Sequence, residues 1–190
     1  MLPIMTFEQA AAAPNIAYVF DRKLALPYES LVTLLHKFAL FNAIPGQVLV
    51  ARYAGRVDPF EGVLFTSTHA RAISRDLHLR RDMAWQARRG LGTSNWLTLR
   101  FCSCCLAQRF HSTVHQRTTV PTCPLHRLPV QERCPHCGQR IELRLCVHLI
   151  EHPHSCSHCG GNLCAPARRG APMRRLAQKF CAPLARASIG

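Results

Sequence analysis

Residues 102–159 contain four pairs of Cys or His residues: Cys102-Ser-Cys-Cys105, Cys123-Pro-Leu-His126, Cys134-Pro-His-Cys137 and Cys156-Ser-His-Cys159. Each pair leaves two residues between its outer members, a spacing that lets both side chains reach one metal ion from a single turn. Seventeen residues separate the first pair from the second, and eighteen separate the third from the fourth. The last two pairs therefore match the pattern of a structural zinc site, and the first two repeat it with a histidine as fourth ligand.

Eight ligands in this order predict two structural Zn²⁺ ions, each held by four protein side chains. We expect a sequential grouping: Cys102, Cys105, Cys123 and His126 in one site, and Cys134, Cys137, Cys156 and Cys159 in the other. A cross-braced grouping of the same eight residues stays open. Neither set leaves the open coordination position that a catalytic zinc needs, so the predicted role is scaffolding.

Other roles for the eleven cysteines are less well supported. Met1–Ala13 lacks a charged n-region, and Pro3, Thr6 and Glu8 interrupt its apolar residues, so it does not resemble a signal peptide. A cytoplasmic location, which we predict, favours metal binding over disulfides. A redox CxxC would be expected as a single motif beside a βαβ pattern, which we do not find. Cys104 is expected to be a spare thiol, and three residues remain as replacement ligands: His152, His154 and Cys164.

The chain is strongly basic, with 24 Lys and Arg against 10 Asp and Glu and a formal charge of +14 at pH 7. It stays basic when two zinc ions and seven thiolates are included. This charge predicts a polyanionic partner, DNA or RNA, held mainly through phosphates. No apolar run approaches the roughly 20 residues that span a bilayer, so no membrane association is expected.

The expected fold is mainly α with small zinc-bound β elements. We divide it into an N-terminal arm (1–24), a helical, helix-turn-helix-like domain (25–98), a double zinc-binding module (99–165) of zinc-ribbon or zinc-finger type, and a basic tail (166–190). The clearest helix lies within 26–40, with Pro27 in its first turn and an apolar stripe at Leu31, Leu34, Leu35, Phe38 and Ala39. His36 and Lys37 lie off this stripe and are expected to be solvated.

Further helices are predicted over Thr68–Leu77 and Arg80–Arg89, whereas Gln47–Tyr53 fits either a helix or a strand. Arginines crowd the outer side of the two helices and are the candidate nucleic-acid contacts: Arg71, Arg75, Arg80, Arg81, Arg88 and Arg89. The arrangement is compatible with a helix-turn-helix unit. A solvated basic face is the open alternative. Trp85 and Trp96 are expected in the core or at a domain junction.

Strand character is predicted for Asn95–Arg100, Gln116–Val120 and Arg140–Leu149. The last segment alternates well and predicts the hairpin of a zinc ribbon between two Cys-x-x-Cys turns. Gly138 and Gly160 directly follow these turns, where positive φ is often required.

Three motifs resemble the TniQ family, the target-selection proteins of certain transposons. Leu26-Pro-Tyr-Glu-Ser-Leu31 is similar to the family's opening, and Arg100-Phe-Cys-Ser-Cys-Cys-Leu106 to its aromatic-Cys-Pro-x-Cys-Leu turn. Thr122-Cys-Pro-Leu-His126 and Cys134-Pro-His-Cys-Gly138 resemble the two steps that follow. The chain departs from the pattern at Ser103, at Ala107-Gln108-Arg109, near His115 where a tryptophan is expected, and in ending soon after the second site.

The resemblance implies an adaptor for DNA transposition and not an enzyme. Such a protein links target recognition, by DNA or by an RNA-guided CRISPR effector, to a TnsC-like AAA+ ATPase that regulates the transposase. It would act in the bacterial cytoplasm, as a monomer or a homodimer. The alternatives are a stand-alone zinc-containing DNA-binding regulator and, least favoured, a zinc hydrolase or nuclease. We find neither a paired-carboxylate cluster for two-metal chemistry nor a Walker A sequence.

Overall fold

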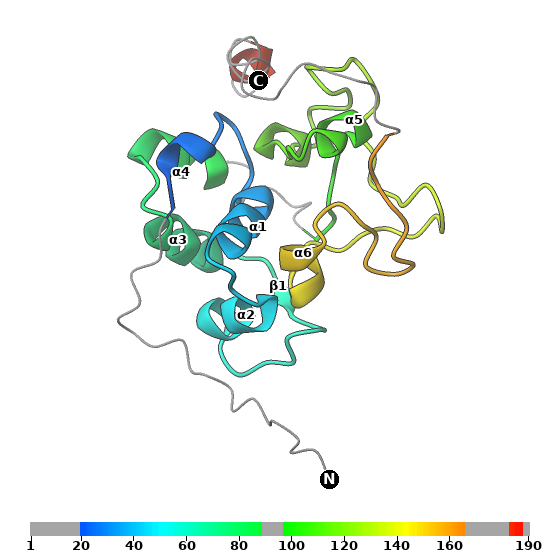
Figure 1. The fold of residues 1–190 in the computed structure, drawn as a ribbon. Helices are drawn as coiled ribbons and strands as arrows, with labels where there is room; N and C mark the ends of the chain where they lie inside the picture. The colour runs from blue at the N-terminus through cyan, green and yellow to red at the C-terminus, as the bar shows by residue number, and fades with distance from the viewer. Residues whose placement is uncertain (1–19, 89–96, 166–182, 188–190) are drawn as a thin grey trace.

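The computed structural model describes residues 20–88, 97–165 and 183–187, apart from the side chains of 22 and 86–88 (Figure 1). The elements follow in the order η1 (Arg22–Leu24), α1 (Leu31–Phe41), α2 (Gly46–Ala54), β1 (Val63–Leu64), α3 (Ser67–Asp76), α4 (Arg81–Arg88), α5 (Ser103–Ala107), η2 (Thr113–Gln116), β2 (Arg144–Leu145) and α6 (Val147–Glu151). A further helical segment spans 183–187. The described chain is therefore rich in short helices, with one small sheet.

The central helix α1 buries the apolar stripe predicted from the sequence, since all five of its residues lie in the core. Its start is later than predicted. Ser30 is the N-cap residue, in an extended conformation, so Pro27 lies before the helix and not in its first turn. The apolar spacing in the sequence predicts which face of α1 is buried, whereas the N-cap residue determines where the helix begins.

The predicted helices at 68–77 and 80–89 correspond to α3 and α4, and the ambiguous segment 47–53 is helical, as α2. A capping box starts α3: Thr66 accepts from the His69 amide, and the His69 ring bonds the Thr66 amide. Ile73, Leu77 and Ala84 are buried on the inner side of the two helices. Four residues, 77–80, join α3 to α4, and the reading of this pair as a DNA-binding helix-turn-helix stays a prediction.

The predicted strand 140–149 is only half right. Residues Ile141, Leu143 and Leu145 alternate inward, but the chain then turns into α6. The neighbours Leu149 and Ile150 are both buried, which a strand buried on one face does not allow. The expected zinc-ribbon hairpin is therefore absent from this described segment, because these residues cover helices α1 and α2 instead.

The strand predicted at Gln116–Val120 is also not formed, since Gln116 ends η2 and a turn follows. This turn accepts hydrogen bonds from the buried guanidinium of Arg100, at the carbonyls of Arg117 and Val120. The Nε of Arg100 also donates a hydrogen bond to the carboxylate of Glu132 at 2.9 Å. The Arg100 side chain thus provides the hydrogen bonds that a neighbouring strand would otherwise donate to these carbonyls.

Extended segments join the two halves of the chain around 141–145. On one side, β1 pairs antiparallel with β2, with Val63 opposite Leu145. On the other side, the Leu99 amide donates to Ile141 at 2.7 Å, and the Leu143 amide donates to Leu97 at 2.9 Å. Of the strand predicted at 95–100, 95 and 96 lie outside the described residues, and Thr98 forms a single bridge to Glu142.

One hydrophobic core extends across the boundary that we predicted at residue 98. It contains side chains of α1, α2 and α3 together with Leu99, Phe101, Leu145 and Ile150. Figure 1 shows α6, in yellow, beside α1 and α2. His36, predicted to be solvated, is half-buried, with its Nδ1 2.7 Å from the Ile150 carbonyl. The prediction failed because α6 covers that side of α1.

Hydrogen bonds also connect the start of α1 to the segment before η2, and this second connection between the two halves of the chain is called the joint below. The Ser30 amide donates to the His111 carbonyl at 2.8 Å, and the Thr113 amide donates to Tyr28 at 3.0 Å. The His111 ring lies between Ser30 Oγ and the Arg100 carbonyl, 2.7 Å from each. Because a carbonyl can only accept, Nε2 carries the proton, and Nδ1 accepts from the Ser30 hydroxyl.

A buried ion pair supports this joint. Lys37, also predicted to be solvated, lies 2.7 Å from Glu29, whose side chain has no exposed surface. Glu29 further accepts from the Leu26 amide, and Lys37 donates to the Leu24 carbonyl. Burial raises the pKa of Glu29, although the Lys37 charge opposes the rise. The two side chains bond the backbone on both sides of Ala25, so they order the chain before α1.

The variant Lys37→Met leaves the Glu29 carboxylate buried without its counter-charge. We expect the free energy of unfolding to fall by about 3 kcal/mol, measured by urea denaturation of the metal-loaded protein. Lys23→Met, at an exposed lysine, is the matched control and should change stability by less than about 0.5 kcal/mol. Equal effects of the two variants would contradict the role of the ion pair.

His111 should make stability depend on pH. Burial lowers its pKa to about 3, whereas an unfolded histidine has a pKa near 6.5. Below that value the unfolded chain binds more protons than the folded one, so stability falls as pH falls. We expect His111→Gln to reduce the slope of unfolding free energy between pH 6 and 5 by about 1.4 kcal/mol per pH unit. Equal slopes would show that His111 is not buried in its neutral form.

Candidate metal centres

The structure brings the eight predicted ligands together in two groups of four. In each group the donor atoms all lie within 4.8 Å of one another: Cys102, Cys105, Cys123 and His126 in the first, and Cys134, Cys137, Cys156 and Cys159 in the second. The grouping is sequential, as we expected, and not cross-braced. Each group could hold one metal ion.

The distances within the groups fit a tetrahedral zinc ion. Zinc bonds of about 2.3 Å to sulfur and about 2.0 Å to nitrogen place sulfurs roughly 3.8 Å apart and nitrogen roughly 3.5 Å from sulfur. In the first group, Cys105 Sγ lies 3.7 Å from Cys123 Sγ and 3.3 Å from His126 Nδ1. In the second, the Cys134–Cys159 and Cys137–Cys156 sulfur distances are 3.7 and 3.8 Å. A disulfide would need about 2.05 Å.

Three of the four ligand pairs lie on the same kind of turn. In each, the residue after the second ligand donates its amide to the carbonyl of the first ligand at 2.9 Å, and its φ is positive. Gly138 and Gly160 occupy this position in the second site, as the sequence predicted, and Arg127 occupies it in the first. The pair Cys102–Cys105 differs, because Cys102 is the N-cap of α5 and Cys105 lies within that helix.

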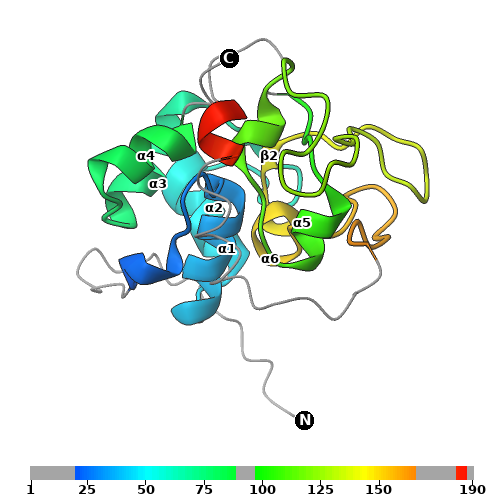
Figure 2. The same cartoon turned by 90° about the horizontal axis from the view of Figure 1, so that it is seen from above.

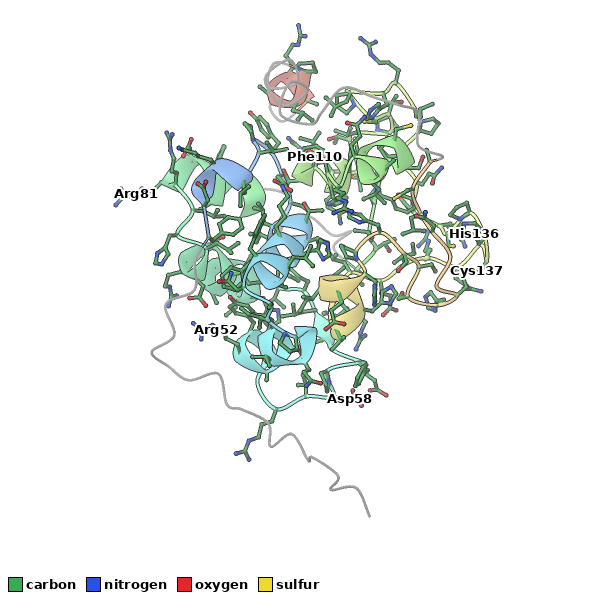
Figure 3. The ribbon with its side chains drawn as sticks, viewed as in Figure 1. Arg52, Asp58, Arg81, Phe110, His136 and Cys137 are labelled. Carbon is green, nitrogen blue, oxygen red and sulfur yellow. The ribbon has the colours of Figure 1, made fainter. Side chains whose placement is uncertain are left out.

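Two histidines inside the turns of the second site connect the two turns to each other. His136 Nε2 lies 2.8 Å from the carbonyl of Asn162, and His158 Nε2 lies 3.0 Å from the carbonyl of Arg140. Each ring therefore bonds the backbone beyond the opposite turn. Sequence reasoning missed this role, and the only signal of it is that each histidine lies inside a Cys-x-x-Cys turn. Figure 3 shows His136 and Cys137 at the outer edge of the molecule.

The two candidate centres differ in burial. Cys102, Cys105 and Cys123 are fully buried, with Phe110, Val114 and Leu184 around them. Leu184 belongs to the segment 183–187, which lies beside η2 in Figure 2. In the second site, Cys159 is exposed and Cys137 is partly exposed. The first centre is thus part of the protein interior, whereas the second lies near the surface.

Charge also couples the donors of the first centre. Hydrogen bonds to Cys102 and Cys123 raise the pKa of His126 to about 10, and hydrogen bonds from Cys102 and Cys105 lower the pKa of the Cys123 thiol. Both shifts favour a charged pair of imidazolium and thiolate in the metal-free site. A metal ion that binds here displaces the imidazolium proton, so its affinity increases with pH.

The other cysteines among the described residues, and the nearby histidines, lie outside both groups. Cys104 is partly exposed on α5, Cys146 is buried at the N-cap of α6, and Cys164 follows the last turn. His152 and His154, the predicted replacement ligands, are not among the donors either. His115 was not predicted as part of the site, but its Nε2 lies 3.4 Å from Cys123 Sγ.

Of the candidate nucleic-acid residues, Arg71 and Arg75 lie on α3, Arg80 directly precedes α4, and Arg81 and Arg88 lie on α4. Arg71, Arg75, Arg80 and Arg81 are exposed, and Arg80 lies 3.3 Å from Asp82 in a solvent-exposed ion pair. Figure 3 shows Arg81 projecting from the body of the molecule. The side chain of Arg88, and Arg89 as a whole, lie outside the described residues. Trp85, which is expected in the core or at a domain junction, is 50% exposed on α4 and is therefore not a core residue; Trp96 is not described.

No protein-family model matches this chain, and a search of curated proteins found no match. Among the described residues, none of the helices has the length and apolar character required to cross a membrane.

The variant Cys159→Ser tests whether the two centres are independent. Cys159 is the most exposed ligand, so its loss should disturb packing least. We expect the metal content to fall from two ions to one, measured by native mass spectrometry, with the first centre still loaded. Cys164→Ser, the same change five residues further along, should keep both ions. Loss of both ions in Cys159→Ser would mean that the centres fold as one unit.

Proposed function

We propose that the chain is a zinc-stabilised adaptor for DNA transposition, similar to TniQ proteins, which links target recognition to an AAA+ ATPase that regulates the transposase. The observation that carries this proposal is the composition of the centres. Four protein donors complete the coordination of a zinc ion, which leaves no position for water or substrate. The centres then stabilise loops, and the protein acts by binding partners and not by catalysis.

The distribution of charge supports a nucleic-acid partner. Arg71 and Arg75 lie four residues apart on α3, so they share one face of that helix. Arg80 and Arg81 lie at the start of α4, which packs on α3. Exposed guanidinium groups on two adjoining helices suit the phosphates of duplex DNA, which they bind with little dependence on sequence. The resemblance of the three sequence motifs adds the ATPase and the target-recognition system as further partners.

A stand-alone DNA-binding regulator is the second candidate, and Trp85 favours it. This half-exposed indole lies on the same helix as Arg81, one turn further along. An aromatic ring beside an arginine is able to stack on an unpaired base or to contact a groove. The regulator and the adaptor would use the same surface, and they differ in whether DNA binding needs the ATPase.

Co-sedimentation separates the two functions. The zinc-loaded protein is mixed with duplex DNA and ATP, with and without a TnsC-like AAA+ ATPase. The adaptor predicts co-sedimentation that depends on the ATPase. Sedimentation with DNA alone, unchanged by the ATPase, would favour the regulator. If the protein sediments neither with DNA alone nor with DNA and the ATPase, both proposed functions are overturned.

The double variant Arg71→Gln and Arg75→Gln tests the surface directly. We expect weaker DNA binding at low salt and a decrease of about 2 in the slope of log affinity against log salt. Fluorescence anisotropy with labelled duplex DNA measures both quantities. The control removes two exposed arginines elsewhere, Arg56→Gln and Arg140→Gln. Equal losses in both double variants would show that overall charge, and not the α3 surface, holds the DNA.

A further inference from the structure

His115 is a buried histidine next to the first metal centre, but it is not one of the four donors. It lies on η2 and has no exposed surface. Its Nε2 is 3.4 Å from Cys123 Sγ and 3.9 Å from Cys105 Sγ. The ring thus points one nitrogen at the edge between two of the three sulfurs.

The other ring nitrogen decides where the proton lies. His115 Nδ1 is buried, and it has no hydrogen-bond partner in the described structure. A proton on Nδ1 would leave a buried donor without an acceptor and would turn the lone pair of Nε2 toward two sulfurs. A proton on Nε2 instead gives an N–H group facing two acceptors, and leaves only an unpaired acceptor at Nδ1. Because a buried unpaired donor costs free energy, the Nε2–H form is favoured.

We propose that His115 is a positioning residue of the first metal centre: its Nε2–H donates a hydrogen bond to the thiolates of Cys123 and Cys105 when these bind zinc. Three thiolates and a neutral histidine around Zn²⁺ carry a net negative charge in the protein interior. An N–H group directed at two of the sulfurs stabilises this negative charge in the protein interior, where water does not. It also holds the sulfurs at their tetrahedral positions.

The rest of the fold holds the ring in place. The His115 amide donates to the Ser112 carbonyl, and the Ser112 hydroxyl caps η2 through the Val114 amide. His111 contacts the ring edge-on, with centroids 5.7 Å apart. Since His111 also bonds Ser30 at the start of α1, the donor to the thiolates is fixed by the joint between the two halves of the chain.

Gln and Met variants at position 115 separate hydrogen bonding from packing. The two side chains have similar size, but only Gln has an N–H donor. We expect His115→Met to lose the metal of the first centre at chelator concentrations about 10- to 100-fold lower than wild type. His115→Gln should remain close to wild type. The second centre, in the same molecule, is the internal control.

Two measurements follow the metal in the full-length protein. Alkylation of freed thiols in the presence of chelator, followed by peptide mass mapping, shows whether Cys105 and Cys123 or the cysteines of the second centre are released first. In protein loaded with Co²⁺, the sulfur-to-cobalt charge-transfer band should move to longer wavelength in His115→Met, because a hydrogen bond lowers the energy of the sulfur lone pairs. That shift reports on the sulfurs and not on stability.

The proposal is overturned if Gln and Met variants lose metal equally, since packing alone would then explain the residue. It is also overturned if both keep metal and spectrum like wild type. None of these outcomes depends on DNA or the ATPase, so the result is independent of the proposed function.

Discussion

Tetrahedral geometry around two candidate metal ions is the constraint on which residues 102–159 depend. The described part of this stretch has only short elements: α5, η2, β2 and α6 together account for few of its residues. Segments with so little regular structure form too few backbone hydrogen bonds to offset the conformational entropy that they lose on folding. A metal ion binds the folded site much more strongly than the unfolded chain and fixes each turn, so metal binding and folding are coupled in such modules. The turns then carry the side chains that pack against α1.

The metal-binding region and the helices form a continuous structure. Arg100 bonds the turn before the second ligand pair, His111 connects that region to Ser30, and α6 covers α1 and α2. The first centre lies in the protein interior, whereas the second lies near the surface. A change at the first centre would therefore reach the helices more directly than a change at the second.

This arrangement is compatible with the adaptor function that we propose, because it separates a buried scaffold from exposed side chains. Arg81 on α4 lies on one side of the molecule, and Cys137 of the second centre lies on the opposite edge (Figure 3). A protein that joins two partners needs two such surfaces held at a fixed distance. The shared core provides that rigidity.

The sequence by itself determined the eight candidate ligands, the positive φ at Gly138 and Gly160, and the buried face of α1, but it left the grouping of the ligands open. These features are local: two ligands on one turn, a glycine after it, or an apolar residue every three or four positions. Only the tertiary structure decided the rest. Leu149 and Ile150 form a helix and not a strand because α1 and α2 offer them a surface, and Lys37 is paired because the chain before α1 places Glu29 beside it. His115 faces two thiolates across a fold that no local pattern specifies. Contacts between distant segments leave no periodic pattern in the sequence, so only the tertiary structure reveals them.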